Sequence, residues 1–183
     1  APREARLLLR WASGLDAAAL GLNLDEPSPA EEVARLAEAL AARAARRPFS
    51  HITGRRAFWQ HDFIVTPDVL DPRPETETLV ALALEGPAPA QIADIGTGSG
   101  CILLSLLAAW PEARGIGIDA SAAALAVAQR NAAQLGLADR TQFRRGQWLA
   151  PLTVPLDMLV SNPPYLASAE LADLSPEVAA EPR

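Results

Sequence analysis

The stretch that decides the fold reads Gln91-Ile92-Ala93-Asp94-Ile95-Gly96-Thr97-Gly98-Ser99-Gly100. Its first half is a short apolar run of the kind that forms a buried strand, and its second half alternates glycine with small polar residues. Residues 102–110 continue as an apolar helix, which Pro111 ends, and residues 114–118 form a second predicted strand. A strand, a glycine turn, a helix and another strand in this order predict a parallel α/β unit.

Alternating elements continue on the C-terminal side of this unit. A helix is predicted over residues 121–135, with Gly136 as its stop, and strands are predicted over residues 141–144 and 156–161. We therefore expect a Rossmann-like core over residues 74–183, with four parallel strands and helices on both faces of the sheet. Because the sequence ends without further strands that would complete such a sheet, we expect the core to be truncated at its C-terminal end.

The N-terminal part has a different character. Residues 3–22 and 29–46 each show apolar residues at helical spacing and predict two amphipathic helices. The second helix has three start signals, namely Ser28 as its cap, Pro29 at the first helical position and Glu31 in a capping box. We interpret residues 1–47 as a small helical lobe that docks the substrate.

Residues 48–73 link this lobe to the α/β core. They are rich in aromatic and β-branched side chains, with a bend predicted at residues 54–56 and a hairpin over residues 58–65. A further helix is predicted to open within residues 71–77 and to run through Leu84, since acidic residues in its first turn suit the helix dipole.

Composition excludes several classes of protein. The chain has 183 residues, half of them hydrophobic, without an apolar run long enough to cross a bilayer or a secretory signal, so we expect a cytoplasmic location. Cys101 is the single cysteine, which excludes an internal disulfide, and with two distant histidines it offers no metal site. A net charge of −6 is poorly suited to stable nucleic-acid binding.

The glycine turn is the first candidate site. Glycines there let the backbone approach a ligand closely, and the following helix presents free N–H groups. Dinucleotide enzymes use a similar turn, but Gly-x-Gly-x-Gly preceded by Asp94 is typical of enzymes that bind S-adenosylmethionine. We assign to this cofactor Asp94 and the turn residues Gly96, Thr97, Gly98, Ser99 and Gly100.

Three residues at or after the ends of the next two strands complete the predicted cofactor site. Asp119 ends the second strand, where a carboxylate can accept both ribose hydroxyls, although it could instead cap the following helix. After the third strand, Gln147 could read the adenine amine and Trp148 could stack on the adenine ring. The alternative for Trp148 is an ordinary core residue.

The sharpest signal is Asn162-Pro163-Pro164-Tyr165, directly after the fourth strand. An amide or amino nitrogen conjugated to a π-system is a poor nucleophile because its lone pair is delocalised. The Asn162 side-chain oxygen and the Pro163 carbonyl can accept from its N–H groups, and the prolines preset the backbone. Tyr165 can pack against the planar group. Together with the glycine turn, these residues predict transfer of a methyl group from S-adenosylmethionine to a planar nitrogen, with S-adenosylhomocysteine as the product.

Across nearly its whole length the sequence resembles the release-factor glutamine methyltransferases, the HemK/PrmC family. The resemblance is carried by five stretches, residues 51–59, 65–67, 72–77, 94–100 and 162–165. It implies a class I S-adenosylmethionine-dependent methyltransferase that modifies the glutamine side-chain nitrogen (N5) in the Gly-Gly-Gln motif of peptide chain release factors. It also implies catalytic roles for Asn162, Pro163 and Tyr165, and substrate contacts from these residues and Pro164, with Asn162 also next to the cofactor.

The sequence departs from the family pattern at two positions. Gln147 stands where the family has an aspartate, and Asp71 stands where it has an apolar residue. Two alternatives stay open, an adenine-N6 methyltransferase acting on DNA or RNA, and an inactive fragment that binds cofactor without turnover. We expect a monomer with release factors as protein partners.

Overall fold

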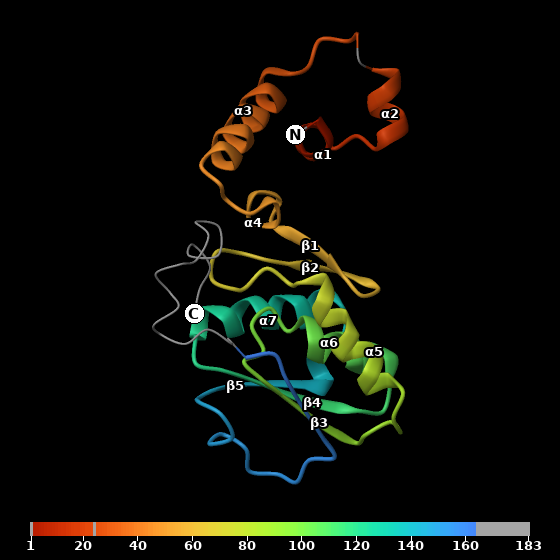
Figure 1. The fold of residues 1–183 in the computed structure, drawn as a ribbon, viewed down its shortest axis with the longest axis vertical. Helices are drawn as coiled ribbons and strands as arrows, with labels where there is room; N and C mark the ends of the chain where they lie inside the picture. Colours follow the sequence, from red (N-terminus) through yellow and green to blue (C-terminus); the bar gives the residue numbers. More distant parts are fainter. Residues whose placement is uncertain (1, 24, 164–183) are drawn as a thin grey trace. The chain divides into compact units, whose positions relative to one another are not determined.

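The computed structural model describes residues 2–23 and 25–163 (Figure 1). The chain divides into two compact units, residues 1–53 and residues 54–183. Within the described residues, no helix has the length and apolar character needed to cross a membrane.

The first unit is helical. Its elements are α1 (Pro2–Ser13), α2 (Ala17–Leu22), α3 (Ala30–Ala44) and α4 (Phe49–Thr53). Helices α1 and α3 pack together, with an ion pair of 3.2 Å between Arg43 and Glu4. Arg35 adds a hydrogen bond of 3.0 Å from Nη1 to the carbonyl of Ala12. Helices α1, α2 and α3 lie within the predicted lobe of residues 1–47, whereas α4 lies in the predicted linker.

Two details of the predicted lobe are wrong, and the predicted linker differs at its start. The single helix expected over residues 3–22 is broken, because Gly14 has a φ of +70° and Asp16 caps a new helix by accepting from the Ala19 N–H at 2.7 Å. The cap of α3 is Pro29, whose ψ of 143° places it outside the helix, so the capping box expected from Ser28 is not formed. In the linker, residues 49–53 form the helix α4, which the sequence pattern did not predict.

The second unit begins with a hairpin, which spans residues 55–64 and not the predicted residues 58–65. Strands β1 (Arg55–Phe58) and β2 (His61–Ile64) pair antiparallel, with Phe58 opposite His61. The bend expected at residues 54–56 is confined to Gly54, which has a φ of +73°, because Arg55 and Arg56 already lie in β1. The turn of the hairpin falls after Phe58, at Trp59, which has a φ of +55°.

A parallel sheet forms the centre of the second unit. Its strands run in the order β5-β4-β3-β6, and all pairings are parallel, as predicted. The elements are the 3₁₀ helix η1 (Pro74–Thr76), α5 (Glu77–Leu84), β3 (Gln91–Ile95), α6 (Cys101–Ala109), β4 (Arg114–Asp119), α7 (Ala122–Gln134), the 3₁₀ helix η2 (Ala138–Arg140), β5 (Thr141–Arg145) and β6 (Met158–Ser161). On the central strand, Asp94 lies opposite Gly117 of β4 and Val160 of β6.

Within the described residues, helices cover one face of this sheet only. Figure 1 shows α5, α6 and α7 on the same side, where Ile92 and Val160 join a cluster with the buried leucines of α6. On the other face, Ile116 and Ile118 pack with Leu152 of the segment that joins β5 to β6. That segment contains Pro151 and Pro155 and forms no helix, so the expectation of helices on both faces is wrong for this part of the chain.

Candidate active site

The candidate site lies where three neighbouring strands end. Ile95, the last residue of β3, pairs with Ile118 of β4 on one side and with Ser161 of β6 on the other. In each of the three segments, the residue that follows this row is a predicted site residue. Gly96 is therefore flanked by Asp119 and Asn162 at the carboxyl edge of the sheet, the usual place for a ligand in an open α/β sheet.

The glycine turn has the backbone that its sequence predicts. Gly96, Gly98 and Gly100 have φ values of 71°, 54° and 80°, which side chains disfavour. A Cβ at Gly96 or Gly98 would meet open space, whereas one at Gly100 would lie 3.1 Å from Leu104 Cδ1 and 3.3 Å from the Cβ of Ala128. The first two glycines thus leave the backbone accessible to a ligand, and the third allows helices α6 and α7 to pack closely.

Asp119 is held in place by backbone groups. Its Oδ2 accepts from the Gly98 N–H and its Oδ1 from the Ser121 N–H, both at 2.9 Å. The cap of α7 is Ser121, whose Oγ accepts from the Ala124 N–H at 3.2 Å, so Asp119 is not that cap. Each carboxylate oxygen has a second lone pair, and Asp119 is only half-buried, so both oxygens can still accept from the hydroxyls of a ribose.

Asp94 is fully buried beneath the turn. Burial raises the pKa of its carboxyl to about 7, and the bond from Thr97 Oγ1 to its Oδ2, at 2.7 Å, offsets only part of this increase. The Leu103 backbone also lowers the pKa, and the negative charge of Asp119 raises it. Within the described residues, the other buried oxygen, Oδ1, accepts no hydrogen bond. Burial likewise raises the pKa of the Cys101 thiol to about 12, so that this cysteine stays protonated and serves packing.

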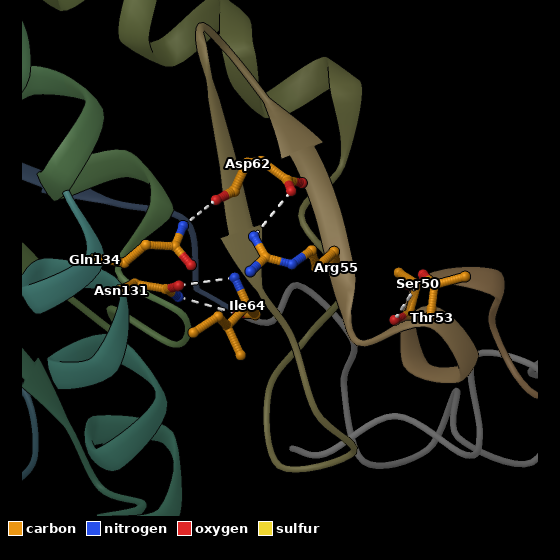
Figure 2. Close-up of polar contacts among 7 residues, drawn as sticks. All are labelled: Ser50, Thr53, Arg55, Asp62, Ile64, Asn131 and Gln134. Atoms are coloured by element: carbon orange, nitrogen blue, oxygen red, sulfur yellow. Dashed lines mark hydrogen bonds and ion pairs between the residues drawn. The ribbon is translucent and has the colours of Figure 1, made fainter. Parts of the chain in front are cut away.

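A buried asparagine that the sequence did not single out supports the turn. Asn131 of α7 donates from Nδ2 to the carbonyls of Ser99, at 2.8 Å, and Ile64, at 3.0 Å, and its Oδ1 accepts from the Ile64 N–H at 2.7 Å. Figure 2 shows the pair of bonds to Ile64 and, beside it, Gln134 donating to the carbonyl of Asp62. Asn131 therefore joins the glycine turn to the hairpin. The sequence does contain a hint of this role, because Asn131 is a polar residue on the apolar face of a predicted helix.

Asn162 comes directly after β6 and is half-buried. Its Nδ2 donates to Thr76 Oγ1 at 3.0 Å, and the preceding Ser161 donates from Oγ to the Ile95 carbonyl at 2.8 Å. Pro163 is also half-buried. Pro164 and Tyr165 lie outside the described residues, so their predicted roles stay predictions.

The predicted adenine-contacting residues follow β5. The Gly146 N–H donates to the Asp119 carbonyl at 3.0 Å, which brings this segment next to the end of β4. Gln147 is exposed, and Trp148 has 69% of its surface exposed with a φ of +52°. Trp148 is therefore not a core residue. No described residues form a cluster of acidic, histidine or cysteine side chains that could hold a metal ion.

Comparison with known proteins identifies the family. The model of the methyltransferase small domain matches residues 69–178, and that of the PrmC N-terminal domain matches residues 1–54. The chain belongs to the methyltransferase small domain family. The resemblance to release-factor glutamine methyltransferases and the expected methyltransferase fold, with its helical N-terminal part, are thereby confirmed.

Similar proteins carry the release-factor name. The release factor glutamine methyltransferase of Cereibacter sphaeroides is 52% identical over 97% of this chain and 64% of its own length. That of Rhodospirillum rubrum is 49% identical over 97% of this chain and 55% of its own length. The chain thus spans less than two thirds of the length of these relatives.

Among solved structures, a SAM-dependent methyltransferase from Thiobacillus denitrificans in complex with S-adenosyl-L-homocysteine is 30% identical over 49% of this chain and 36% of its own length. The TM-score of this match is 0.41.

Proposed function

We propose that the protein methylates the side-chain amide nitrogen of the glutamine in the Gly-Gly-Gln motif of peptide chain release factors, with S-adenosylmethionine as the methyl donor. The observation that carries this proposal is the position of the open glycine turn between Asp119 and Asn162 at the carboxyl edge of the sheet. A cofactor in the turn would lie next to an acceptor amide held by Asn162.

The residues of the turn fit this cofactor. Gly96 and Gly98 leave open space beside their backbone, and Asp119 is fixed with lone pairs for two ribose hydroxyls. We assign the adenine to the exposed segment at Gln147 and Trp148. When bound, S-adenosylmethionine supplies a methyl group on a cationic sulfur, which keeps the bonding electron pair and leaves as S-adenosylhomocysteine.

Asn162 and Pro163 would prepare the acceptor nitrogen. The oxygen of the Asn162 amide and the Pro163 carbonyl would accept from the two N–H groups of the glutamine amide, which favours a pyramidal nitrogen with an available lone pair. That lone pair forms the new bond to carbon, and the nitrogen afterwards loses one proton to water. No side chain is then needed as a base before the transfer, and Tyr165 would pack against the planar amide.

The choice of release factors over nucleic acid rests on charge and on the first unit. A net charge of −6 disfavours the phosphate backbone of DNA or RNA, on which an adenine-N6 methyltransferase must act. The N-terminal unit matches a domain named after the PrmC proteins, and we propose that residues 1–47 dock the release factor. Relatives with the release-factor name support the same substrate.

Transfer of labelled methyl groups tests this function. Purified release factor, its Gly-Gly-Gln variant with Gln→Ala, and duplex DNA would each be incubated with the protein and labelled S-adenosylmethionine. We expect label on the wild-type release factor alone. Asn162→Ala should abolish this transfer while cofactor affinity, measured by calorimetry, stays largely unchanged. Label on DNA would instead indicate an adenine methyltransferase, and cofactor binding without label on any acceptor would indicate a non-catalytic binding unit.

A further inference from the structure

We propose that Thr76 is a positioning residue that fixes the orientation of the Asn162 amide and thereby selects the acceptor nitrogen. This inference rests on the proposed function, because it concerns how Asn162 would meet the glutamine amide. It starts from the bond of 3.0 Å that Asn162 Nδ2 donates to Thr76 Oγ1, between residues 86 positions apart in the sequence.

The orientation of an asparagine amide decides whether it presents an acceptor or a donor to a ligand. A rotation of about 180° around the last side-chain bond exchanges the carbonyl oxygen, an acceptor, with the NH₂ group, a donor. With its NH₂ group on Thr76, Asn162 turns its oxygen away from Thr76 and can present it to an incoming N–H group. In the reverse orientation, the Asn162 NH₂ group would face the NH₂ group of the glutamine, and two donors cannot bond to each other.

Thr76 can impose this choice because its own segment is anchored. It lies at the junction of η1 and α5, and the neighbouring Glu77 accepts from the Trp59 N–H through Oε1 at 2.9 Å. Arg56 of β1 donates from Nε to the Pro72 carbonyl at 3.0 Å. Val80, one turn further along α5, is fully buried in the core cluster. The Thr76 hydroxyl is thus presented from a segment that is bonded to the hairpin and packed on the core.

The same anchoring gives a role to an unexpected residue. Asp71, which the resemblance would have as apolar, is buried, and its Oδ2 lies 3.6 Å from Arg56 Nη1. Arg56 therefore contacts both Asp71 and the Pro72 carbonyl, at the start of the segment that carries Thr76. The aspartate at this position therefore adds a contact to the start of the segment that carries Thr76.

Substitution of Thr76 tests the proposal. Thr76→Val keeps the shape and removes the hydroxyl, Thr76→Ser keeps the hydroxyl, and Thr78→Val makes the same change at an exposed position two residues away. Loss of one hydrogen bond corresponds to a decrease of about 2- to 12-fold. We expect Thr76→Val to lower kcat for release-factor methylation by about that factor at unchanged S-adenosylmethionine affinity. Thr76→Ser and Thr78→Val should stay within about two-fold of wild type. Equal kcat values for Thr76→Val and wild type would overturn the proposal.

A second measurement does not depend on turnover. The side-chain ¹⁵N–¹H₂ signals of Asn162, assigned by their loss in Asn162→Ala, should shift and exchange faster with water in Thr76→Val but not in Thr76→Ser. Unchanged signals in Thr76→Val would overturn the positioning role even in a protein that transfers no methyl group. Absence of methyl transfer by the wild-type protein, with the expected signal changes, would overturn the proposed function and leave the Thr76–Asn162 contact supported.

Discussion

Replacement of Asp94 by asparagine should change how the stability of the protein depends on pH. Asp94 lies on the central strand, has no exposed surface and has one oxygen without a hydrogen bond from any described residue. Its pKa is about 7 in the folded chain, against an ordinary value of 3.8. A difference of this size corresponds to roughly 4 kcal/mol of folding free energy.

The sign of the effect follows from which state loses the proton first. Below about pH 4, the folded and unfolded chains both hold it, and the stability associated with the protonated carboxyl is fully present. As the pH rises from about 4 to 7, the unfolded chain releases the proton while the folded chain keeps it, so the free energy of unfolding falls. Above about pH 7 the loss is complete. The amide introduced by Asp94→Asn cannot titrate, and its oxygen can still accept from the Thr97 hydroxyl, which bonds the carboxyl in the wild-type chain.

Urea unfolding of the cofactor-free protein between about pH 4 and pH 8.5 measures this dependence. Fluorescence of Trp59 and Trp110 is a suitable probe because both pack against the core of the second unit. The free energy of unfolding of Asp94→Asn minus that of wild type should rise by roughly 4 kcal/mol from about pH 4 to pH 7 and then level off. Subtraction removes the titration of all other groups. A difference that stays constant over this range would refute the assignment of a buried, protonated carboxyl.

Two further substitutions test other parts of the site. Asp119→Ala should weaken S-adenosylmethionine binding by about 10- to 100-fold in calorimetry, because hydrogen bonds to a charged group are lost. Unchanged affinity would contradict the assignment of Asp119 to the cofactor site. Asn131→Ala should lower the free energy of unfolding by about 3 kcal/mol, because the buried Ser99 carbonyl and the partly buried N–H and carbonyl of Ile64 lose their partner. The matched change Gln134→Ala removes one exposed bond and should cost less than about 1 kcal/mol in the same urea titration; equal losses would contradict the role of Asn131.

Features encoded by neighbouring residues could be predicted from the sequence. The strand at residues 91–95, the glycine turn and the helix after it are each determined by local apolar runs and by backbone angles that favour glycine. The parallel sheet followed because short alternating strands and helices have few possible arrangements. The positions of Asp119 and Asn162 beside the turn could then be expected from the strand ends alone.

Contacts between distant segments could not be predicted in this way. The bond between Thr76 and Asn162 depends on where the end of η1 lies relative to the end of β6, and no local pattern contains that information. The break at Gly14 was missed because the local pattern is misleading there. The helical spacing of apolar residues continues past Gly14, whereas the helix itself ends before it. Asn131 was overlooked since a single polar residue in a helix is common, and only the structure shows the three backbone groups that it satisfies.

The strand order β5-β4-β3-β6 has a consequence for the chain as the ribosome produces it. Strands β3, β4 and β5 can pair as soon as they emerge, but one edge of β3 has unpaired backbone groups until Met158–Ser161 follow. Asp157 holds the start of that last strand next to β3, because its Oδ2 accepts from the N–H groups of Ala90 and Gln91 at 2.9 and 2.8 Å. The nascent protein would therefore contain its glycine turn before it gains Asn162, and the edge of β3 that later pairs with β6 would have unpaired backbone groups in the interval.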